Sequence, residues 1–212
     1  MTTVAPPTLL LPIGQFFGTF HPVVGSAERY HRVRLRDEVW ELEDPRFLVW
    51  ALLHGVVGPL AERPWTFETL REAAAEHLGP EHDLAALLAD LDGAGLAARV
   101  APGSDEAIGF ARRHRIGARM LGLGNSADEP WLYAIGFFDH PVIKVTRTVY
   151  DLWERCPSGE SLWDLCAALA AEERQAGGTE PDLIDPEVML AGFLTTVHSL
   201  LVSSALYLEP MP

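Results

Sequence analysis

The predicted secondary structure elements follow one another in the same order twice along this chain, and that repetition limits the fold more than any single motif. In the first round, two strands over 30–42 precede three helices and a short returning strand at Leu96–Val100. In the second round, strands at Arg115–Leu123 and Trp131–Phe137 precede three more helices and a last strand at Ala205–Leu208. This order predicts an α+β protein with two similar halves, each a small antiparallel β-hairpin or sheet packed on three helices.

The first hairpin is predicted from a period-two pattern. Val33 and Leu35 alternate with arginines, and Trp40 and Leu42 alternate with their neighbours after a turn at Asp37-Glu38. Successive side chains of a strand point to opposite faces, so this pattern indicates two half-buried strands.

The helix starts are predicted from capping residues. Asp44-Pro45 predicts a helix over 44–55, with aspartate as the N-cap and proline at the first helical position. Thr66 caps a predicted helix over 67–78, and Ser161 with Asp164 resembles a capping box before a helix over 162–173. The remaining helices are expected over 81–92, 142–154 and 185–203.

The domain boundaries are predicted from segments that contain proline and glycine. Residues 1–28 predict an extended N-terminal arm with a short strand at Gln15–Phe20, and Pro102–Glu106 predicts a connector. We therefore expect two domains, over 29–104 and 105–212.

Charge and cysteine content narrow the classes of partner and compartment. The formal net charge is −14, from 30 acidic and 16 basic residues, so we expect no nucleic acid partner, because an acidic body repels phosphate. No run approaches the roughly 20 apolar residues that span a bilayer, and no basic segment opens the chain, so we expect a cytoplasmic protein without a membrane partner. The two cysteines, Cys156 and Cys166, are expected to be reduced thiols.

A hairpin followed by three helices is the arrangement of the winged-helix superfamily, and the first half resembles the PqqD-like fold, also called the RiPP recognition element. The resemblance implies a three-stranded sheet packed on three helices that binds leader peptides of ribosomally made natural products. The second half matches more weakly, because its hairpin loop is longer and its last helix is extended. The segments that carry the resemblance are Val33–Leu42, Asp44–Gly55, Thr66–Leu70 and Leu84–Leu96.

Such a fold binds an extended peptide at its outer strand, with side chains entering a groove beside the third helix. The sequence does not say which residues of each strand face the core. In the first half the expected groove residues are Val39, Trp40 and Leu42 facing Leu84, Leu88 and Leu91. In the second half they are Trp131, Tyr133 and Ile135 facing Phe193, Val197 and His198.

Arginines cluster on the first hairpin, where they have two interpretations. Arg32, Arg34 and Arg36 could bind acidic side chains of a leader peptide, because guanidinium groups suit carboxylates. Alternatively, they form a solvated strand face that nearby Asp and Glu neutralise. A second cluster, Arg112, Arg113, Arg115 and Arg119, surrounds the second hairpin.

No catalytic or metal-binding constellation is apparent, so we expect no catalytic residues, no metal and no cofactor. The chain has no Gly-x-Ser-x-Gly elbow, no His-x-x-x-His and no Cys-x-x-Cys. His21-Pro22 and His140-Pro141 recur in similar surroundings, and we expect turn or core histidines there.

The sequence therefore predicts a non-catalytic binding module that captures a precursor peptide for a separate modifying enzyme. The alternative is an accessory subunit of a larger complex, such as a helper of a peptide-modifying metalloenzyme or a condensin-type partner. A transcription regulator is disfavoured, because the predicted helices over 81–92 and 185–203 contain no Lys or Arg to meet base edges.

Overall fold

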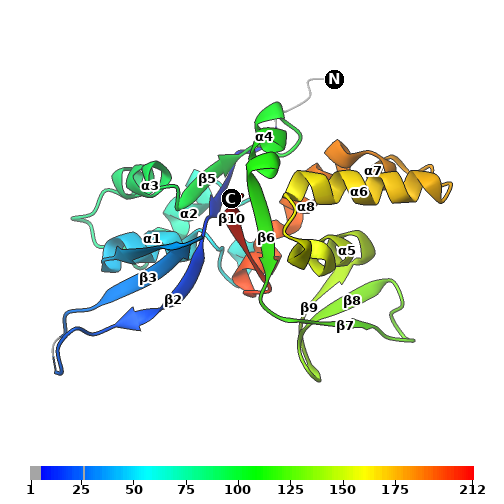
Figure 1. Ribbon diagram of the computed structural model, residues 1–212. Helices are drawn as coiled ribbons and strands as arrows, with labels where there is room; N and C mark the ends of the chain where they lie inside the picture. Colours follow the sequence, from blue (N-terminus) through cyan, green and yellow to red (C-terminus); the bar gives the residue numbers. More distant parts are fainter. Residues whose placement is uncertain (1–5, 26) are drawn as a thin grey trace.

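The computed structural model describes residues 6–25 and 27–212, and within them the protein is α+β, as expected (Figure 1). Eight α-helices occur in this part of the chain, beside two three-stranded and two two-stranded antiparallel sheets. None of the helices in the described residues is both long and apolar enough to cross a membrane.

The first half contains a two-stranded ribbon, a three-stranded sheet and three helices. Strands β1 and β5 form the ribbon, and β2, β3 and β4 form the sheet in that order, so that β2 and β4 are its outer strands. In chain order the elements are β1 (Leu9–Pro12), β2 (Gln15–Phe20), β3 (Tyr30–Leu35), β4 (Glu38–Leu42), α1 (Asp44–Leu52), the 3₁₀ helix η1 (Pro59–Glu62), α2 (Phe67–Ala74), α3 (Leu84–Gly93) and β5 (Ala97–Val100).

The second half repeats this arrangement after helix α4. Strands β6 and β10 form its ribbon, and β7, β8 and β9 form its sheet, with β8 in the middle. The elements are α4 (Asp105–Arg113), β6 (His114–Ala118), β7 (Leu121–Asn125), β8 (Leu132–Phe137), β9 (His140–Thr146), α5 (Arg147–Arg155), the 3₁₀ helix η2 (Cys156–Ser158), α6 (Leu162–Gln175), α7 (Pro181–Ile184), α8 (Pro186–Val202) and β10 (Leu206–Pro210).

The repeat extends to single residues that have unusual backbone or side-chain geometry. The turns between the second and third strands of the two sheets place Arg36 and Phe138 at positive φ, 57° and 45°. Trp50, the seventh residue of α1, donates from Nε1 to the carbonyl of Ile13, and Trp153, the seventh residue of α5, donates to that of Ala205. Each indole thereby ties the first helix of its half to a segment beside the ribbon.

The N-terminal residues are part of the fold, which corrects the expectation of an extended arm. The strand expected at Gln15–Phe20 is present as β2, but β1 is also a strand, paired with β5 and buried along its whole length. Its side chains divide between the two cores, because Leu10 packs in the first and Leu11 in the second. Residues 1–5 of the expected arm lie outside the described part.

Three further expectations were wrong. Pro102–Glu106 is not simply a connector, because α4 begins at Asp105. The expected helix over 142–154 begins only at Arg147, since the preceding residues form β9. Asp44 is not the N-cap of α1: Glu43 holds that position, and the Asp44 carboxylate binds other side chains instead.

The two halves meet along a boundary that we call the seam, which includes strand β1 and helix α8. His198 on α8 has its Nε2 2.9 Å from the carbonyl oxygen of Leu10 on β1. Gly14 donates its backbone N–H to the carbonyl of Leu208, joining the start of the first sheet to the second ribbon. Figure 1 shows the result, with the first half on one side of the ribbon β6–β10 and the helices of the second half on the other.

Candidate functional site

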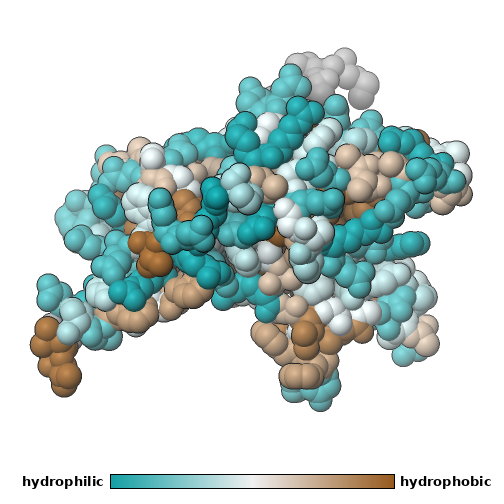
Figure 2. Space-filling model, in the orientation of Figure 1, coloured by the Kyte–Doolittle hydropathy of each residue, from teal (hydrophilic) through white to brown (hydrophobic). Residues whose placement is uncertain are grey.

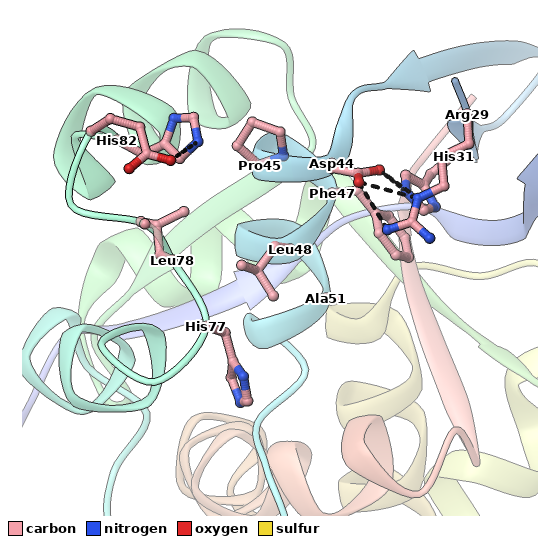
Figure 3. A pocket seen from close by; sticks show the side chains of 12 residues that line it. Arg29, His31, Asp44, Pro45, Phe47, Leu48, Ala51, His77, Leu78 and His82 are labelled. Atoms are coloured by element: carbon pink, nitrogen blue, oxygen red, sulfur yellow. Dashed lines mark hydrogen bonds and ion pairs between the residues drawn. The ribbon is translucent and has the colours of Figure 1, made fainter. Parts of the chain in front are cut away.

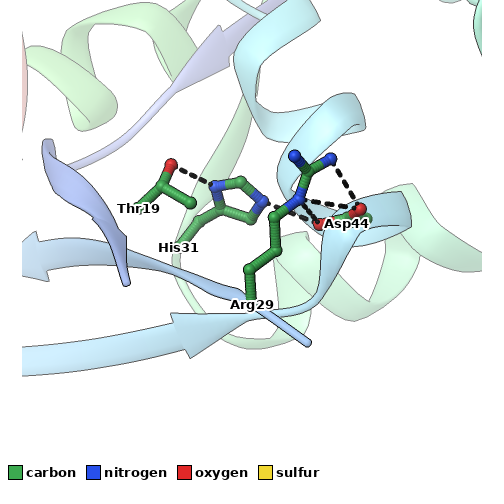
Figure 4. Close-up of polar contacts among 4 residues, drawn as sticks. All are labelled: Thr19, Arg29, His31 and Asp44. Atoms are coloured by element: carbon green, nitrogen blue, oxygen red, sulfur yellow. Dashed lines mark hydrogen bonds and ion pairs between the residues drawn. The ribbon is translucent and has the colours of Figure 1, made fainter. Parts of the chain in front are cut away.

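A chain of polar side chains, which we call the clasp, joins strands β2 and β3 to the start of α1 (Figure 4). Thr19 Oγ1 lies 2.9 Å from His31 Nδ1, and His31 Nε2 lies 2.9 Å from Asp44 Oδ1. Arg29 donates to both carboxylate oxygens of Asp44, with nitrogen–oxygen distances of 2.8–3.1 Å. The clasp thus consists of Thr19, Arg29, His31 and Asp44.

The clasp ties the two strands to the helix through the Asp44 carboxylate. Hydrogen bonds from Arg29 and then from His31 lower the pKa of the Asp44 carboxyl to about 2. Arg29 is therefore the main partner that keeps this carboxylate charged. The buried ring of His31 also stacks on Phe47, with 3.8 Å between ring centroids, which fixes it in place.

The clasp borders a hollow of about 470 Å³ on the outer side of α1 (Figure 3). Its opposite wall is the loop between α2 and α3, which supplies His77 and Leu78. Most titratable groups in it are paired: Arg29 and His31 bind Asp44, and His82 Nε2 lies 3.4 Å from Glu81. Pro45 and Leu48 also line the hollow, and they give it an apolar surface beside the paired polar groups.

Two further hollows lie on the seam, and we call them together the seam cleft. One, of about 320 Å³, lies between β9 and α8, and the first-half loop 55–58 forms its third wall. The other, of about 360 Å³, follows α8 towards Pro6 and Pro102. Both hollows are lined by Ala61, Arg63, Trp65, His198 and Ser199.

Two histidines at the seam are held uncharged. Burial lowers the pKa of His198 to about 4, although its Nε2 remains bound to the Leu10 carbonyl. Burial likewise lowers the pKa of His54 to about 4, with Arg119 and His198 adding smaller repulsions. The two imidazoles are therefore neutral at pH 7.

Trp65 lies at the junction of the two hollows. Its side chain is only 2% exposed, and its Nε1 has no hydrogen bond partner among the residues that the structure describes. Its carbonyl accepts from the backbone N–H of Leu10 at 2.8 Å, and its ring lies 6.2 Å from that of His198. A buried N–H donor without a partner is uncommon in folded proteins.

The residues expected to form the first groove are divided between surface and core. Val39 is 54% exposed on the outer strand β4, whereas Trp40 and Leu84 are half-buried. Leu42, Leu88 and Leu91 are buried in the first core, so the expectation that they contact a peptide was wrong.

The residues expected to form the second groove lie on or before the middle strand of the sheet and in the core. Tyr133 and Ile135 lie on β8, the middle strand of its sheet, and the exposed Trp131 precedes that strand. Ile135, Phe193 and Val197 are core residues. Of the expected set, only His198 lines the seam cleft.

The arginines of the first hairpin differ in the partners that they have within the protein. Arg32 pairs with Glu41 across the strands at 3.0 Å, and its guanidinium lies over Phe20. Arg34 donates to Gln15 at 3.0 Å and lies over Phe17, 4.4 Å from the ring centroid. Neither Arg34 nor Arg36 has a carboxylate partner within the described residues, so binding of an acidic peptide by these two stays a prediction.

The residues that line the cleft beside β9 were not expected from the sequence, namely Val142, Ile143, Ser199 and Val202. The strand went unrecognised because it runs directly into α5 without a turn. One available signal was the spacing of hydroxyl residues: Thr195 and Ser199 on α8 and Ser203 at its C-cap recur every four residues, and the first two are exposed.

The two cysteines are buried, and the potential metal ligands do not cluster within the described residues. Burial raises the pKa of Cys156 to about 11 and that of Cys166 to about 12, so both remain protonated and unreactive near neutral pH. Within the described ranges, no group of three or more His, Cys, Asp or Glu side chains could hold a metal ion.

Exposed apolar side chains gather at the ends of two hairpins (Figure 2). Val23 and Val24 lie in the loop between β2 and β3, and Phe137 and Phe138 lie at the turn between β8 and β9. Phe138 is 83% exposed in a left-handed backbone conformation, which aromatic residues rarely adopt.

No protein-family model matches this chain, and no curated protein or solved structure matches it either.

Proposed function

We propose that this protein binds an extended polypeptide segment in the seam cleft, where the segment adds a strand to β9 and packs against α8. The observation that carries the proposal is the hollow of about 320 Å³ between these two elements. Strand β9 is an outer strand of its sheet, and outer strands have backbone N–H and C=O groups that another chain can pair with.

The proposal extends to the kind of partner. Each half has a three-stranded sheet followed by helices, and we interpret the halves as two winged-helix-like, PqqD-like units in tandem. The bound segment would then belong to the leader of a ribosomally made precursor peptide, which a separate enzyme modifies. In the second unit the groove lies beside the last strand of the sheet and the last helix, β9 and α8.

A second candidate is an accessory subunit that docks on a larger complex. Phe137 and Phe138 favour it, because they are exposed at one hairpin turn, 50% and 83%. Exposed aromatic side chains are common at the centres of protein interfaces.

Peptide binding is tested with a bulky residue in the cleft. Ser199 is exposed on α8 and lines both hollows, so Ser199→Trp should fill the cleft without disturbing the core. Fluorescence anisotropy with labelled leader segments from short precursor genes beside this protein's own gene should show at least about a tenfold loss of affinity.

The matched control is Val188→Trp, which places the same side chain at a 43% exposed position of α8 outside the cleft. It should leave the affinity unchanged. Failure of every peptide to bind at high micromolar concentration would contradict the proposal, as would equal losses in the two variants.

A further inference from the structure

Strand β5 has an edge that pairs with no other strand in the part of the chain that the structure describes. On its other side it pairs with β1, where Leu10 lies opposite Arg99 but donates its N–H to the carbonyl of Trp65. Pro12 lies opposite Ala97 and has no N–H to donate. Because antiparallel strands alternate between bonded and non-bonded pairs, the backbone N–H and C=O groups of Ala97 and Arg99 point away from β1, towards this free edge.

A groove follows the free edge of β5. It has a volume of about 670 Å³, and residues 97–99 line it together with α4 and the end of α3. Ala97 packs in the first core and Ala98 packs against the second, so their side chains lie on opposite faces of the ribbon. A hollow that touches both residues therefore lies at the edge of β5 rather than over one face, where another strand can enter.

Helix α4 presents opposite charges to this groove. Asp105, Gly109 and Arg113 line the groove at four-residue spacing, which places them on one side of the helix. Asp105 and Arg113 are exposed, and neither has an ion-pair partner among the described residues. Gly109, midway between them, has no side chain that would hold a second helix away. This side of α4 is therefore acidic at its start, basic at its end and open in the middle.

The strand edge and the helix are both complementary to a second copy of themselves. If β5 pairs antiparallel with β5 of another copy about a two-fold axis at Ala98, each Ala97 lies opposite Arg99 of the other copy. The outward-pointing backbone groups can then bond to one another. The same axis makes α4 antiparallel to its copy, so that Asp105 approaches Arg113 of the second copy. The order of the charges along α4 thus favours a second copy as the occupant of this groove.

We propose that this protein forms a two-fold dimer in which the free edges of β5 pair and the α4 helices lie side by side, with Asp105 of each copy bound to Arg113 of the other. The inference goes beyond the proposed function, because this groove and the seam cleft share no lining residue in the described chain. Each copy contributes one short strand and one helix, so we expect a dimer that dissociates at micromolar concentrations.

Exchanging the charges between two variants tests the helix contact. Asp105→Arg and Arg113→Glu each bring like charges together in a homodimer, and each should weaken self-association by at least about tenfold. An equimolar mixture of the two variants regains both ion pairs, and its association should return to within about threefold of that of the unaltered protein. Sedimentation equilibrium at concentrations from about 5 to about 500 µM measures the dimer fraction.

Arg99→Pro tests the strand contact. It removes the outward N–H but no hydrogen bond of the ribbon, so the chain should fold while self-association weakens by at least about tenfold. The matched control is Arg99→Ala, which keeps the N–H and removes the side chain that lies 3.4 Å from Asp92. This control should self-associate to within about threefold of the unaltered protein. If Arg99→Pro does not fold, the mixture of the two charge variants still decides the matter.

Several outcomes would overturn the dimer and leave peptide binding in the seam cleft unaffected. One is a chain that stays monomeric over the whole concentration range, and another is a dimer that all these variants form equally well. A mixture of Asp105→Arg and Arg113→Glu that associates no better than either variant alone would also contradict it. Hydrogen exchange at the Arg99 amide that slows with added leader peptide, but not with protein concentration, would assign the edge to the peptide instead.

Discussion

At the scale of single residues, the clasp shows how a polar group can have a role that its position in the sequence does not suggest. Asp44 precedes a proline at a helix start, which is typical of an N-cap. In the structure its carboxylate instead accepts from Arg29 and His31, because the start of β3 lies beside the start of α1. A carboxylate that can bind two strong donors from a neighbouring strand therefore does so instead of accepting from the backbone N–H groups of its own helix.

The clasp can be tested by removing its central ring. His31→Ala should lower the free energy of unfolding by about 2–3 kcal/mol, because it removes two hydrogen bonds and the buried ring that stacks on Phe47. Urea unfolding followed by tryptophan fluorescence measures the change.

Arg29→Ala is the control for this experiment. Its guanidinium is about half exposed, and exposed ion pairs contribute little to stability, so the loss should be smaller than that of His31→Ala. A loss as large as that of His31→Ala would show that the charge pair, rather than the buried ring, holds the strands to the helix.

At the scale of elements, the two halves use the same devices despite their different sequences. Gly95 and Ser204 both take positive φ after the last helix of their half, at 71° and 58°. Thr66 and Ser161 both cap the second helix, accepting from the N–H three residues on, as expected from the sequence. Equivalent positions in the two halves are thus occupied by different residue types that have the same backbone conformation or the same capping role.

The paired tryptophans provide a prediction at this scale. Trp50→Phe and Trp153→Phe should each cost about 1–3 kcal/mol, because each removes the buried hydrogen bond from the indole to the carbonyl of Ile13 or Ala205. Thermal unfolding of the single variants should show similar shifts. Trp163→Phe, which loses no hydrogen bond in the described structure, should change stability least, and the opposite ranking would refute the equivalence of the two indoles.

At the scale of the whole molecule, the seam makes the two halves interdependent. Strand β1 pairs with β5 of the first half, but the carbonyl of its residue Leu10 is hydrogen bonded to His198 of the second half. The loop after α1 in turn forms a wall of the groove between β9 and α8. The candidate site therefore exists only when both halves are folded and packed together.

The seam should make stability depend on pH. The pKa of both His54 and His198 is about 4 in the folded protein, against about 6.5 for an unfolded histidine, so the unfolded state takes up protons first. Stability should be highest above pH 6.5 and should fall by up to about 1.4 kcal/mol per pH unit for each histidine as the pH drops towards 4.

Urea unfolding at pH 7.5, 6.0 and 5.0 measures this dependence. His198→Asn removes one of the two titrating groups and should reduce the slope over this range by about half, even if it lowers stability at pH 7.5. An unchanged slope in the variant would show that other groups, such as the half-buried His114, carry the pH dependence.

The sequence by itself determined the α+β class, the order of most helices and the caps at Thr66, Ser161 and Asp185, because these depend on local periodicity and on side chains a few residues apart. Only the tertiary structure decided the strands β1 and β9, the burial of Ile135 and Phe193, and the site itself. A short apolar segment becomes a strand through a partner far along the chain, as β1 does with β5. Trp65 and His198 are 133 residues apart, and they line one cleft only because the two halves pack along the seam.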